Sequence, residues 1–243
     1  MAVPAFTDAV ADAGTASAFR SNPTMPSLPR AWRHLFAIAA LAASAWLPAA
    51  AQTTAPVEGL DYALIADGQP WQPLDGRIEV VEVFSYGCVH CFHFQKLVDT
   101  WRAKAPRDVR FTYLPAAFSA GDNFARGFFV AQAQRIDARS HHAVFSAVHE
   151  SSVLPRSGAS IDAIAAFYAT QGARSQARFA EAMASPATDE KLNAARAFAV
   201  RSGVEGTPTL IINGRYRVMG RRLEDILVIA DQLIARERDS ARR

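Results

Sequence analysis

The two cysteines of this 243-residue chain, Cys88 and Cys91, are separated by only two residues. The run from Ile78 to Phe84 before them is apolar and rich in β-branched residues, which is typical of a buried strand. Apolar residues after the pair recur at helical spacing as far as Pro106, and these are Phe94, Leu97, Val98 and Trp101. The pair is therefore predicted to lie where a strand turns into a helix.

The start of a helix favours a reactive thiol. Backbone N–H groups there have no intrahelical partner and carry partial positive charge, so a nearby thiolate is stabilised and its pKa falls. Residues three apart share a helix face, so Cys91 can reach back to Cys88 and close a small disulfide. We expect Cys88 to be the exposed partner and Cys91 to be shielded. A protonated His90 between them would add a second source of stabilisation for the Cys88 thiolate.

Two other roles for the pair were weighed. Cysteines of secreted proteins commonly form structural disulfides, but a loop this small would constrain the unfolded chain very little. A metal site would combine Cys88, His90, Cys91 and His93, yet zinc needs four ligands that converge tetrahedrally, and the sequence has no second cysteine pair. We therefore favour redox chemistry that needs neither a metal nor an organic cofactor.

The N-terminal segment has the pattern of a secretory signal peptide. Basic residues up to Arg33 are followed by an apolar run from Leu35 to Leu47 and by small residues ending at Ala51, after which we predict cleavage. The apolar run is shorter than the roughly twenty residues that a membrane anchor needs. Because Met25 lies closer to the basic segment than Met1 does, we hypothesise that translation begins at Met25. Export would place the cysteines where disulfides persist.

Composition bounds the class of protein. Half of the residues are hydrophobic, which is enough for a substantial core. The formal net charge is +3, but the basic residues are scattered and are not interleaved with aromatic residues, so nucleic acid is not an expected partner.

The order of elements predicts an α/β fold. Five strands are expected, at Tyr62–Ile65, Ile78–Phe84, Val109–Leu114, Thr209–Ile212 and Arg215–Met219. A helix between the second and third strands implies parallel pairing with a right-handed crossover. Asn213-Gly214 predicts a tight hairpin between the last two strands. An amphipathic helix from Leu223 to Ile234 should cover one face of the sheet.

Strand patterns are missing from Pro115 to about Arg201, where helices are expected instead. Ser160 has the position of a helix N-cap. For the three histidines of this region, His141, His142 and His149, we expect surface positions or core packing. The chain is accordingly divided into an N-terminal extension with the signal peptide (1–51), a first part of the main domain (52–114), an inserted helical domain (115–201) and a second part of the main domain (202–243).

Two further positions are candidates for a role near the cysteines. Pro208 opens a strand, where its missing N–H would break a ladder, so Thr207–Pro208 is a candidate cis peptide; an ordinary trans proline is the alternative. A cis bond would leave the Thr207 backbone free to pair with an extended peptide. Glu82 shares a strand face with apolar residues. If it is buried, its pKa is raised and it could relay a proton to Cys91; if a loop opens there, it meets water.

These motifs resemble those of the DsbA family of periplasmic thiol:disulfide oxidases, in the thioredoxin superfamily. The segment from Glu82 to Cys91 resembles its active-site strand and motif, and Gly206-Thr207-Pro208 with Asn213 to Tyr216 resembles its cis-proline loop and hairpin. The helical insert falls where that family places its helical domain, and the likeness spans about residues 58–237. The resemblance implies a thioredoxin-like fold with an inserted all-helical domain.

The resemblance also implies a function. Family members are periplasmic monomers that donate a disulfide to exported proteins and are reoxidised by a quinone-linked membrane partner. The matching positions give the attacked cysteine as Cys88, the resolving cysteine as Cys91, the cis proline as Pro208, the buried acid as Glu82 and the thiolate-stabilising histidine as His90. Val89 stands where the family usually has proline, which leaves the oxidising strength of the pair open.

Three alternatives remain at this point. A reductase or isomerase could use the same fold with a lower potential, although isomerases of this kind usually dimerise through an extra N-terminal domain, for which Gln52 to Arg77 is too short. A metal-binding chaperone is a non-enzymatic alternative. A peptide-binding module would keep its substrate affinity after the loss of both cysteines.

Overall fold

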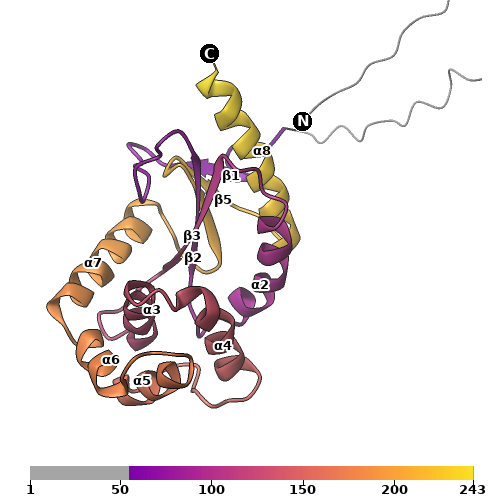
Figure 1. The fold of residues 1–243 in the computed structure, drawn as a ribbon. Helices are drawn as coiled ribbons and strands as arrows, with labels where there is room; N and C mark the ends of the chain where they lie inside the picture. The colour runs from indigo at the N-terminus through magenta and orange to yellow at the C-terminus, as the bar shows by residue number, and fades with distance from the viewer. Residues whose placement is uncertain (1–54, 243) are drawn as a thin grey trace, which may run out of the picture. The chain divides into compact units, whose positions relative to one another are not determined.

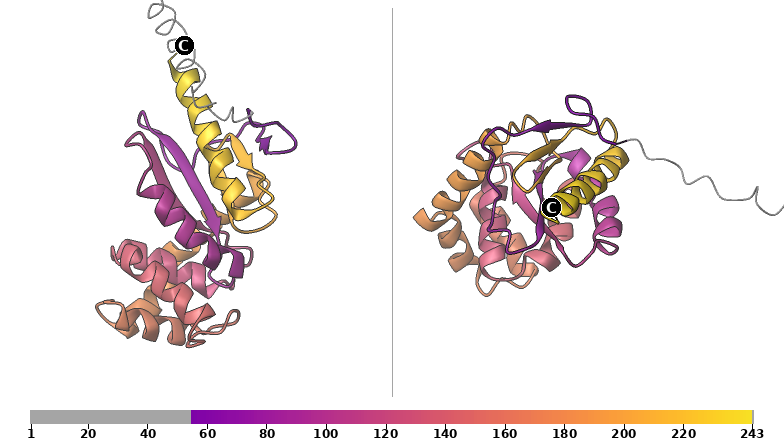
Figure 2. Two further views of the ribbon diagram at one scale, coloured as in Figure 1. Left: turned by 90° about the vertical axis from the view of Figure 1, so that its right-hand side faces the viewer. Right: turned by 90° about the horizontal axis from the view of Figure 1, so that it is seen from above.

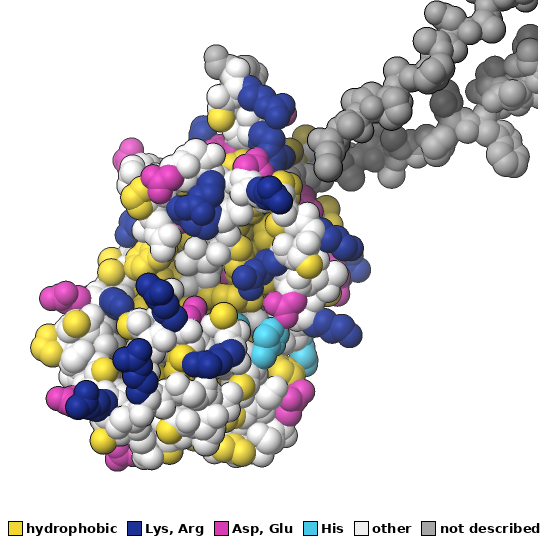
Figure 3. Space-filling model, in the orientation of Figure 1, with side chains coloured by type: hydrophobic (Ala, Val, Ile, Leu, Met, Phe, Trp, Pro, Cys, Tyr) yellow, Lys and Arg dark blue, Asp and Glu magenta, His cyan; other side chains and the backbone are white. Residues whose placement is uncertain are grey.

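The computed structural model describes residues 55–242. The predicted signal peptide, its cleavage after Ala51 and the start at Met25 lie outside the described residues. Within 55–242, no helix is long and apolar enough to cross a membrane. On the face drawn in Figure 3, basic side chains are spread over both the upper and the lower part of the molecule.

A single mixed sheet holds the five predicted strands (Figure 1). They are β1 (Tyr62–Leu64), β2 (Ile78–Phe84), β3 (Val109–Pro115), β4 (Thr209–Ile212) and β5 (Tyr216–Val218), in the spatial order β1-β5-β4-β2-β3. β2 and β3 are parallel, as the helical crossover between them requires, and the other pairs are antiparallel. All seven residues of β2 are buried, so this strand is a rigid support for whatever follows Phe84.

Two helices cover one face of the sheet. Helix α2 (Val89–Arg102) connects β2 to β3, and helix α8 (Leu223–Ala241) ends the chain. Apolar residues of both helices form one core cluster with alternate residues of the strands, including Val80 and Leu210. In the left view of Figure 2, α8 lies against the sheet on the same side as α2. The predicted C-terminal helix is therefore confirmed, and it continues beyond Ile234 to Ala241.

Five helices lie between β3 and β4, where the sequence predicts only helices. They are α3 (Asn123–Ala133), α4 (Asp137–His149), α5 (Ile161–Thr170), α6 (Gln176–Met183) and α7 (Pro186–Arg201). They gather at the end of the sheet to which β2 and β3 lead (Figures 1 and 2). The predicted cap is confirmed, since the Ala163 N–H donates to Ser160 Oγ at 3.1 Å. The helical spacing of apolar residues predicts a helix over His142–His149, and α4 starts five residues earlier, at Asp137, an acidic residue that suits a first turn.

One detail of β3 differs from the expectation. The alternation of its residues predicts one face that is better buried, but residues 109–113 are all half-buried. The physical reason is the position of β3 at the edge of the sheet, where each side chain is covered from fewer sides. Only Leu114 and Pro115, next to the helical insert, are buried.

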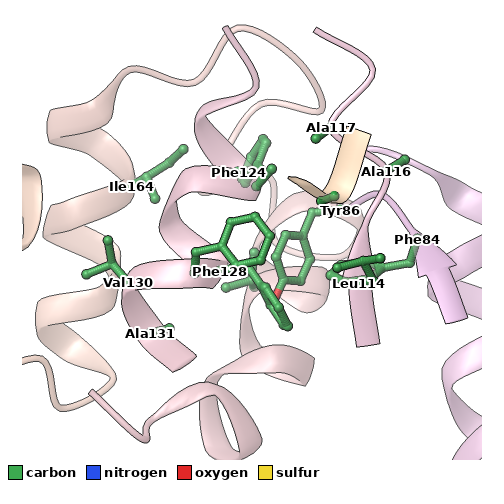
Figure 4. Packing of buried hydrophobic residues seen from close by; sticks show 14 of the residues in the cluster. Phe84, Tyr86, Leu114, Ala116, Ala117, Phe124, Phe128, Val130, Ala131 and Ile164 are labelled. Atoms are coloured by element: carbon green, nitrogen blue, oxygen red, sulfur yellow. The ribbon is translucent and has the colours of Figure 1, made fainter. Parts of the chain in front are cut away.

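The core is continuous between the sheet and the helices. Phe84 at the end of β2 is fully buried and has edge-to-face contacts with Tyr86 and Phe128, with ring centroids 5.0 and 5.4 Å apart. Figure 4 shows these rings together with Leu114 and Phe124, so strand, connecting turn and helix α3 meet in one aromatic cluster. The turn after β2 is thus fixed by packing from the helical side.

Phe84→Ala should lower the free energy of unfolding by about 3–5 kcal/mol, because it leaves a cavity in this cluster. Urea denaturation of the variant and the parent measures the difference. Phe118→Ala is a matched control, since Phe118 is 57% exposed, and its effect should stay within about 0.5 kcal/mol. Equal losses in the two variants would contradict the assignment of Phe84 to the core.

Candidate active site

The cysteine pair lies at the start of α2, as predicted. Cys88 is the N-cap residue, and its Sγ accepts a hydrogen bond from the backbone N–H of Cys91 at 3.3 Å. Both cysteines are free thiols in this structure, so it represents the reduced state. Cys88 is half-buried, whereas Cys91 is fully buried in the larger core cluster. Only Cys88 is therefore accessible to a large reaction partner.

The surroundings of Cys88 favour its thiolate. Its pKa is lowered to about 5, chiefly by a hydrogen bond from the Cys91 thiol. Burial opposes this change, while the Thr207 side chain and the backbone N–H groups of Cys91 and His90 reinforce it. In its neutral form the Cys88 thiol donates to the Thr207 carbonyl oxygen at 3.2 Å. More groups donate hydrogen bonds to Cys88 Sγ than accept one from it, so the thiolate is the more stable form of Cys88 at neutral pH.

Cys91 has the opposite tendency. Burial raises the pKa of its thiol, and the neighbouring Cys88 and Glu82 raise it further. One thiol of the pair is therefore ionised and half-buried at neutral pH, while the other is protonated and fully buried. Thiol–disulfide exchange uses one thiol that leaves readily as a thiolate and a second thiol that resolves the mixed disulfide, and the two protonation states suit these roles.

Glu82 is buried, so the alternative of an open loop is wrong. Its side chain is fully buried in β2, and neither carboxyl oxygen has a hydrogen-bond partner within the described residues. Burial raises the pKa of this carboxyl well above its usual value, and the positive charge of Arg102 offsets only part of that increase. Glu82 therefore holds a proton under conditions in which an exposed glutamate has lost it.

Three residues around Glu82 were missed by the sequence analysis. Tyr113 is its register partner on β3, and the Tyr113 hydroxyl donates to Gln95 Oε1 at 3.2 Å. Arg102 Nη1 lies 3.4 Å from the same hydroxyl, and Arg102 and Tyr113 line a pocket of about 320 Å³. Gln95 is only 3% exposed. A polar residue on the apolar face of α2, one turn after Cys91, was the available signal.

His90 lies in the first turn of α2, and its side chain is exposed. Its contribution to the low pKa of Cys88 comes from its backbone N–H. The stabilisation expected from a protonated His90 ring stays a prediction.

The Thr207–Pro208 peptide bond is cis, which resolves the alternative of an ordinary trans proline. It directly precedes β4, which pairs with β2, so the loop faces the start of α2. Thr207 and Cys88 are separated by 119 positions in the chain and are brought into contact there. The hairpin after β4 is also confirmed: Asn213 and Gly214 have positive φ values of 51° and 65°, and the Arg215 N–H donates to the Ile212 carbonyl oxygen at 2.8 Å. The loop is one residue longer than predicted, because β5 begins at Tyr216 and pairs it with Ile212.

Within residues 55–242, no three His, Cys, Asp or Glu side chains are grouped as the ligands of a metal ion would be. The buried histidine of α4 has another partner, since His141 Nδ1 lies 2.9 Å from the Tyr86 hydroxyl. His142 pairs with Asp99 of α2 at 2.6 Å. The expectation of surface positions or packing therefore describes both residues.

Comparisons with known proteins agree with this geometry. A family model described as a DSBA-like thioredoxin domain matches residues 79–230. The thiol:disulfide interchange protein DsbA of Pseudomonas syringae pv. tomato is 34% identical over 86% of this chain and 98% of its own length. The protein of the same name from Pseudomonas aeruginosa is 33% identical over 87% of this chain and 100% of its own.

Solved structures give the same result. The oxidoreductase DsbA from Xylella fastidiosa superimposes with a TM-score of 0.73 at 44% identity, covering 76% of this chain and 98% of that one. DsbA from Pseudomonas aeruginosa gives a TM-score of 0.68 at 32% identity, covering 76% and 96%. The predicted thioredoxin-like fold with a helical insertion is therefore confirmed.

The low pKa of Cys88 predicts how the stability of the reduced protein depends on pH. Its thiol has a pKa of about 5 when folded, whereas thiols of unfolded chains ionise near about 8.5. Between these values the unfolded state binds more protons, so the unfolding free energy of the reduced protein should rise with pH. The contribution of the Cys88 thiolate to that free energy is lost as pH falls through 5.

Denaturation of the reduced and oxidised forms across this range measures the effect, because the oxidised form has no free thiol at Cys88. Cys88→Ser is the control and should lose the pH-dependent difference. A difference between the two forms that stayed constant with pH would contradict the low pKa.

Proposed function

The chain belongs to the DsbA-like thioredoxin family and is a thiol:disulfide oxidoreductase, and we propose that Cys88 and Cys91 are its redox-active pair. The observation that carries the proposal is the contrast between the two thiols. The pKa of the half-buried Cys88 is lowered to about 5, and the pKa of the buried Cys91 is raised. A thiolate this stable leaves a disulfide readily and favours the reduced enzyme, which makes the pair a donor of disulfides.

The reaction proceeds by two exchanges. A substrate thiolate attacks Cys88 Sγ of the Cys88–Cys91 disulfide, the S–S bond breaks, and the Cys91 sulfur departs with the electron pair and takes up a proton. The second substrate thiolate then attacks the substrate sulfur of the mixed disulfide and displaces Cys88 as a thiolate. The substrate has lost two electrons and gained a disulfide, and the enzyme holds one protonated and one ionised thiol.

Glu82 is proposed to supply and remove the proton of Cys91. Its carboxyl is buried near that thiol, raises the pKa of Cys91 and is itself protonated at a pH where exposed glutamates are ionised. Its oxygens have no hydrogen-bond partner among the described residues, so the carboxyl is free to bond to a new group. A group of raised pKa next to a reacting atom is suited to general acid–base work.

Thr207 and Pro208 are proposed to bind the substrate backbone. Support comes from the position of the Thr207 carbonyl, 3.2 Å from Cys88 Sγ at the half-buried side of the pair. Strand-like hydrogen bonds to an extended chain do not depend on its side chains, which suits an enzyme for many substrates. His90, exposed beside Cys88, is proposed to add positive charge near the thiolate when it is protonated.

Membership of this family supports a proposal for the cellular setting. Proteins are the substrates of disulfide exchange, and we propose that here they are folding exported proteins in the periplasm, reached through the predicted signal peptide. A quinone-linked membrane oxidase would reoxidise the pair, and the enzyme would act as a monomer. Residues 115–201 are proposed as the inserted helical domain, with 52–114 and 202–243 forming the main domain. A reductase of the same fold is the second candidate, because Val89, the first residue of α2, stands between the cysteines where the family usually has proline.

The equilibrium of the pair with glutathione redox buffers tests the proposal. An oxidase should have a reduction potential well above the roughly −270 mV of thioredoxin, because the Cys88 thiolate stabilises the reduced form. Quantifying reduced and oxidised protein at each buffer ratio gives this potential, and Cys91→Ser, which has no second thiol, is the control. A thioredoxin-like potential would instead favour the reductase, with Val89 as the residue to exchange first.

Glu82→Gln tests the proton relay. In a Cys88→Ala background, the pH profile of Cys91 alkylation should change when Glu82 is replaced, because the ionisable neighbour is gone. The unfolding free energy at neutral pH should rise, because glutamine removes the cost of ionising a buried carboxyl, and this gain should fade toward about pH 4.

Glu79→Gln is the matched control, since Glu79 is a second fully buried glutamate of β2. Unlike Glu82 it is paired, accepting hydrogen bonds from the Trp71 and Gln72 N–H groups and from Arg110. Its replacement should destabilise the protein and leave the alkylation profile of Cys91 unchanged. If Glu82→Gln also left that profile unchanged, Glu82 would not be the relay.

A further inference from the structure

One face of α4 lies along the residues that flank the redox pair. His141, Phe145 and His149 are spaced four residues apart and therefore point in the same direction from the helix. Phe145 is 4.9 Å from Tyr86 between ring centroids, and His141 Nδ1 lies 2.9 Å from the Tyr86 hydroxyl. Figure 4 shows the Tyr86 ring within the core that the sheet shares with the inserted helices. The turn before Cys88 therefore packs against helix α4 of the insert.

His149 contacts both this turn and the start of α2. Its Nε2 lies 2.8 Å from the backbone carbonyl oxygen of Tyr86, which comes two residues before Cys88. Its ring also stacks on Phe92, the residue that follows Cys91, with centroids 5.1 Å apart and planes 16° from parallel. Because a carbonyl oxygen can only accept, Nε2 is the nitrogen that carries the hydrogen.

The hydrogen bond to Tyr86 satisfies a group that would otherwise be buried without a partner. Tyr86 is only 2% exposed, so its carbonyl needs a donor. A strand or helix neighbour is the usual source, but Tyr86 lies in the turn between β2 and α2. A side chain of the inserted helices donates instead.

We infer that His149 is a positioning residue for the redox pair, holding Tyr86 and Phe92 so that the Cys91 N–H points at Cys88 Sγ. The effect should depend on the redox state. In the oxidised enzyme the covalent bond between the cysteines fixes the turn by itself. In the reduced enzyme only non-covalent contacts keep the Cys91 N–H 3.3 Å from the sulfur. Loss of His149 should therefore reduce the stabilisation of the Cys88 thiolate in the reduced form and change the oxidised form less.

Two variants separate the contacts of His149. His149→Phe keeps a ring for stacking on Phe92 and loses the donor, whereas His149→Gln keeps an N–H donor and loses the stacking ring. His142→Gln is the control, because His142 also belongs to α4 and contacts α2, but pairs with Asp99 away from the turn. For each protein, the pKa of Cys88 is read from the ultraviolet absorbance of the thiolate, and the equilibrium with glutathione gives the relative stability of the two redox forms.

For His149→Phe we expect a raised Cys88 pKa and an equilibrium shifted about two- to tenfold toward the oxidised enzyme, the range that corresponds to one net hydrogen bond. His149→Gln should lie closer to the parent, and His142→Gln should match it. If His149→Phe lowers the stability of both redox forms equally and leaves the pKa and the equilibrium unchanged, His149 has only a structural role. A shift in His149→Gln alone would likewise overturn the hydrogen-bond assignment.

This inference rests on the proposed redox role of the pair. Measurements on the parent protein separate a failure of that proposed function from a failure of the positioning role of His149. A parent pair that does not exchange with glutathione contradicts the proposed function, while the Cys88 pKa of the variants still tests His149. A parent pair that exchanges normally, with no response in His149→Phe, contradicts the positioning role alone.

Discussion

The hydrogen bond between the Cys91 N–H and Cys88 Sγ is the interaction on which the proposed redox chemistry depends. It exists because Cys88 is the N-cap of α2, where a helix has donors without partners. Two features hold Cys88 at the start of α2. β2 is buried along its whole length, and the turn after Phe84 packs against the inserted helices. The Cys91 thiol and the Cys91 N–H both donate to Cys88 Sγ and lower the pKa of Cys88, while burial raises the pKa of Cys91, so the two thiols differ in protonation.

Much of this arrangement could be predicted from the sequence because its signals are local. The apolar strand before Cys88, the cap at Ser160 and the Asn213-Gly214 hairpin each depend on residues a few positions apart. Two positions that depend on pairing between distant segments, Tyr113 and His149, were missed as members of the site. Tyr113 is beside Glu82 only because β3 pairs with β2 in one register, and His149 is beside Tyr86 only because α4 folds back onto the turn. Neither residue type nor spacing carries that information.

The two buried glutamates of β2 show how differently one residue type is used within a single strand. Glu79 accepts hydrogen bonds from two backbone N–H groups and from Arg110, so its charge is compensated and it ties the preceding loop to the sheet. Glu82, three residues later, lacks such partners among the described residues. An uncompensated acid in the interior is costly to stability, and this cost is consistent with the proposed proton relay.

The strand order has a consequence for the synthesis of the chain. β4 lies between β2 and β5, yet it follows β2 only after all the inserted helices. A chain that emerges from its N-terminus first therefore holds β2 with one edge open until the last part arrives. Thr207 arrives with that part, so the contact beside Cys88 forms late. Such long-range closure makes folding slow, and the protein becomes a finished catalyst only when its C-terminal strands have docked.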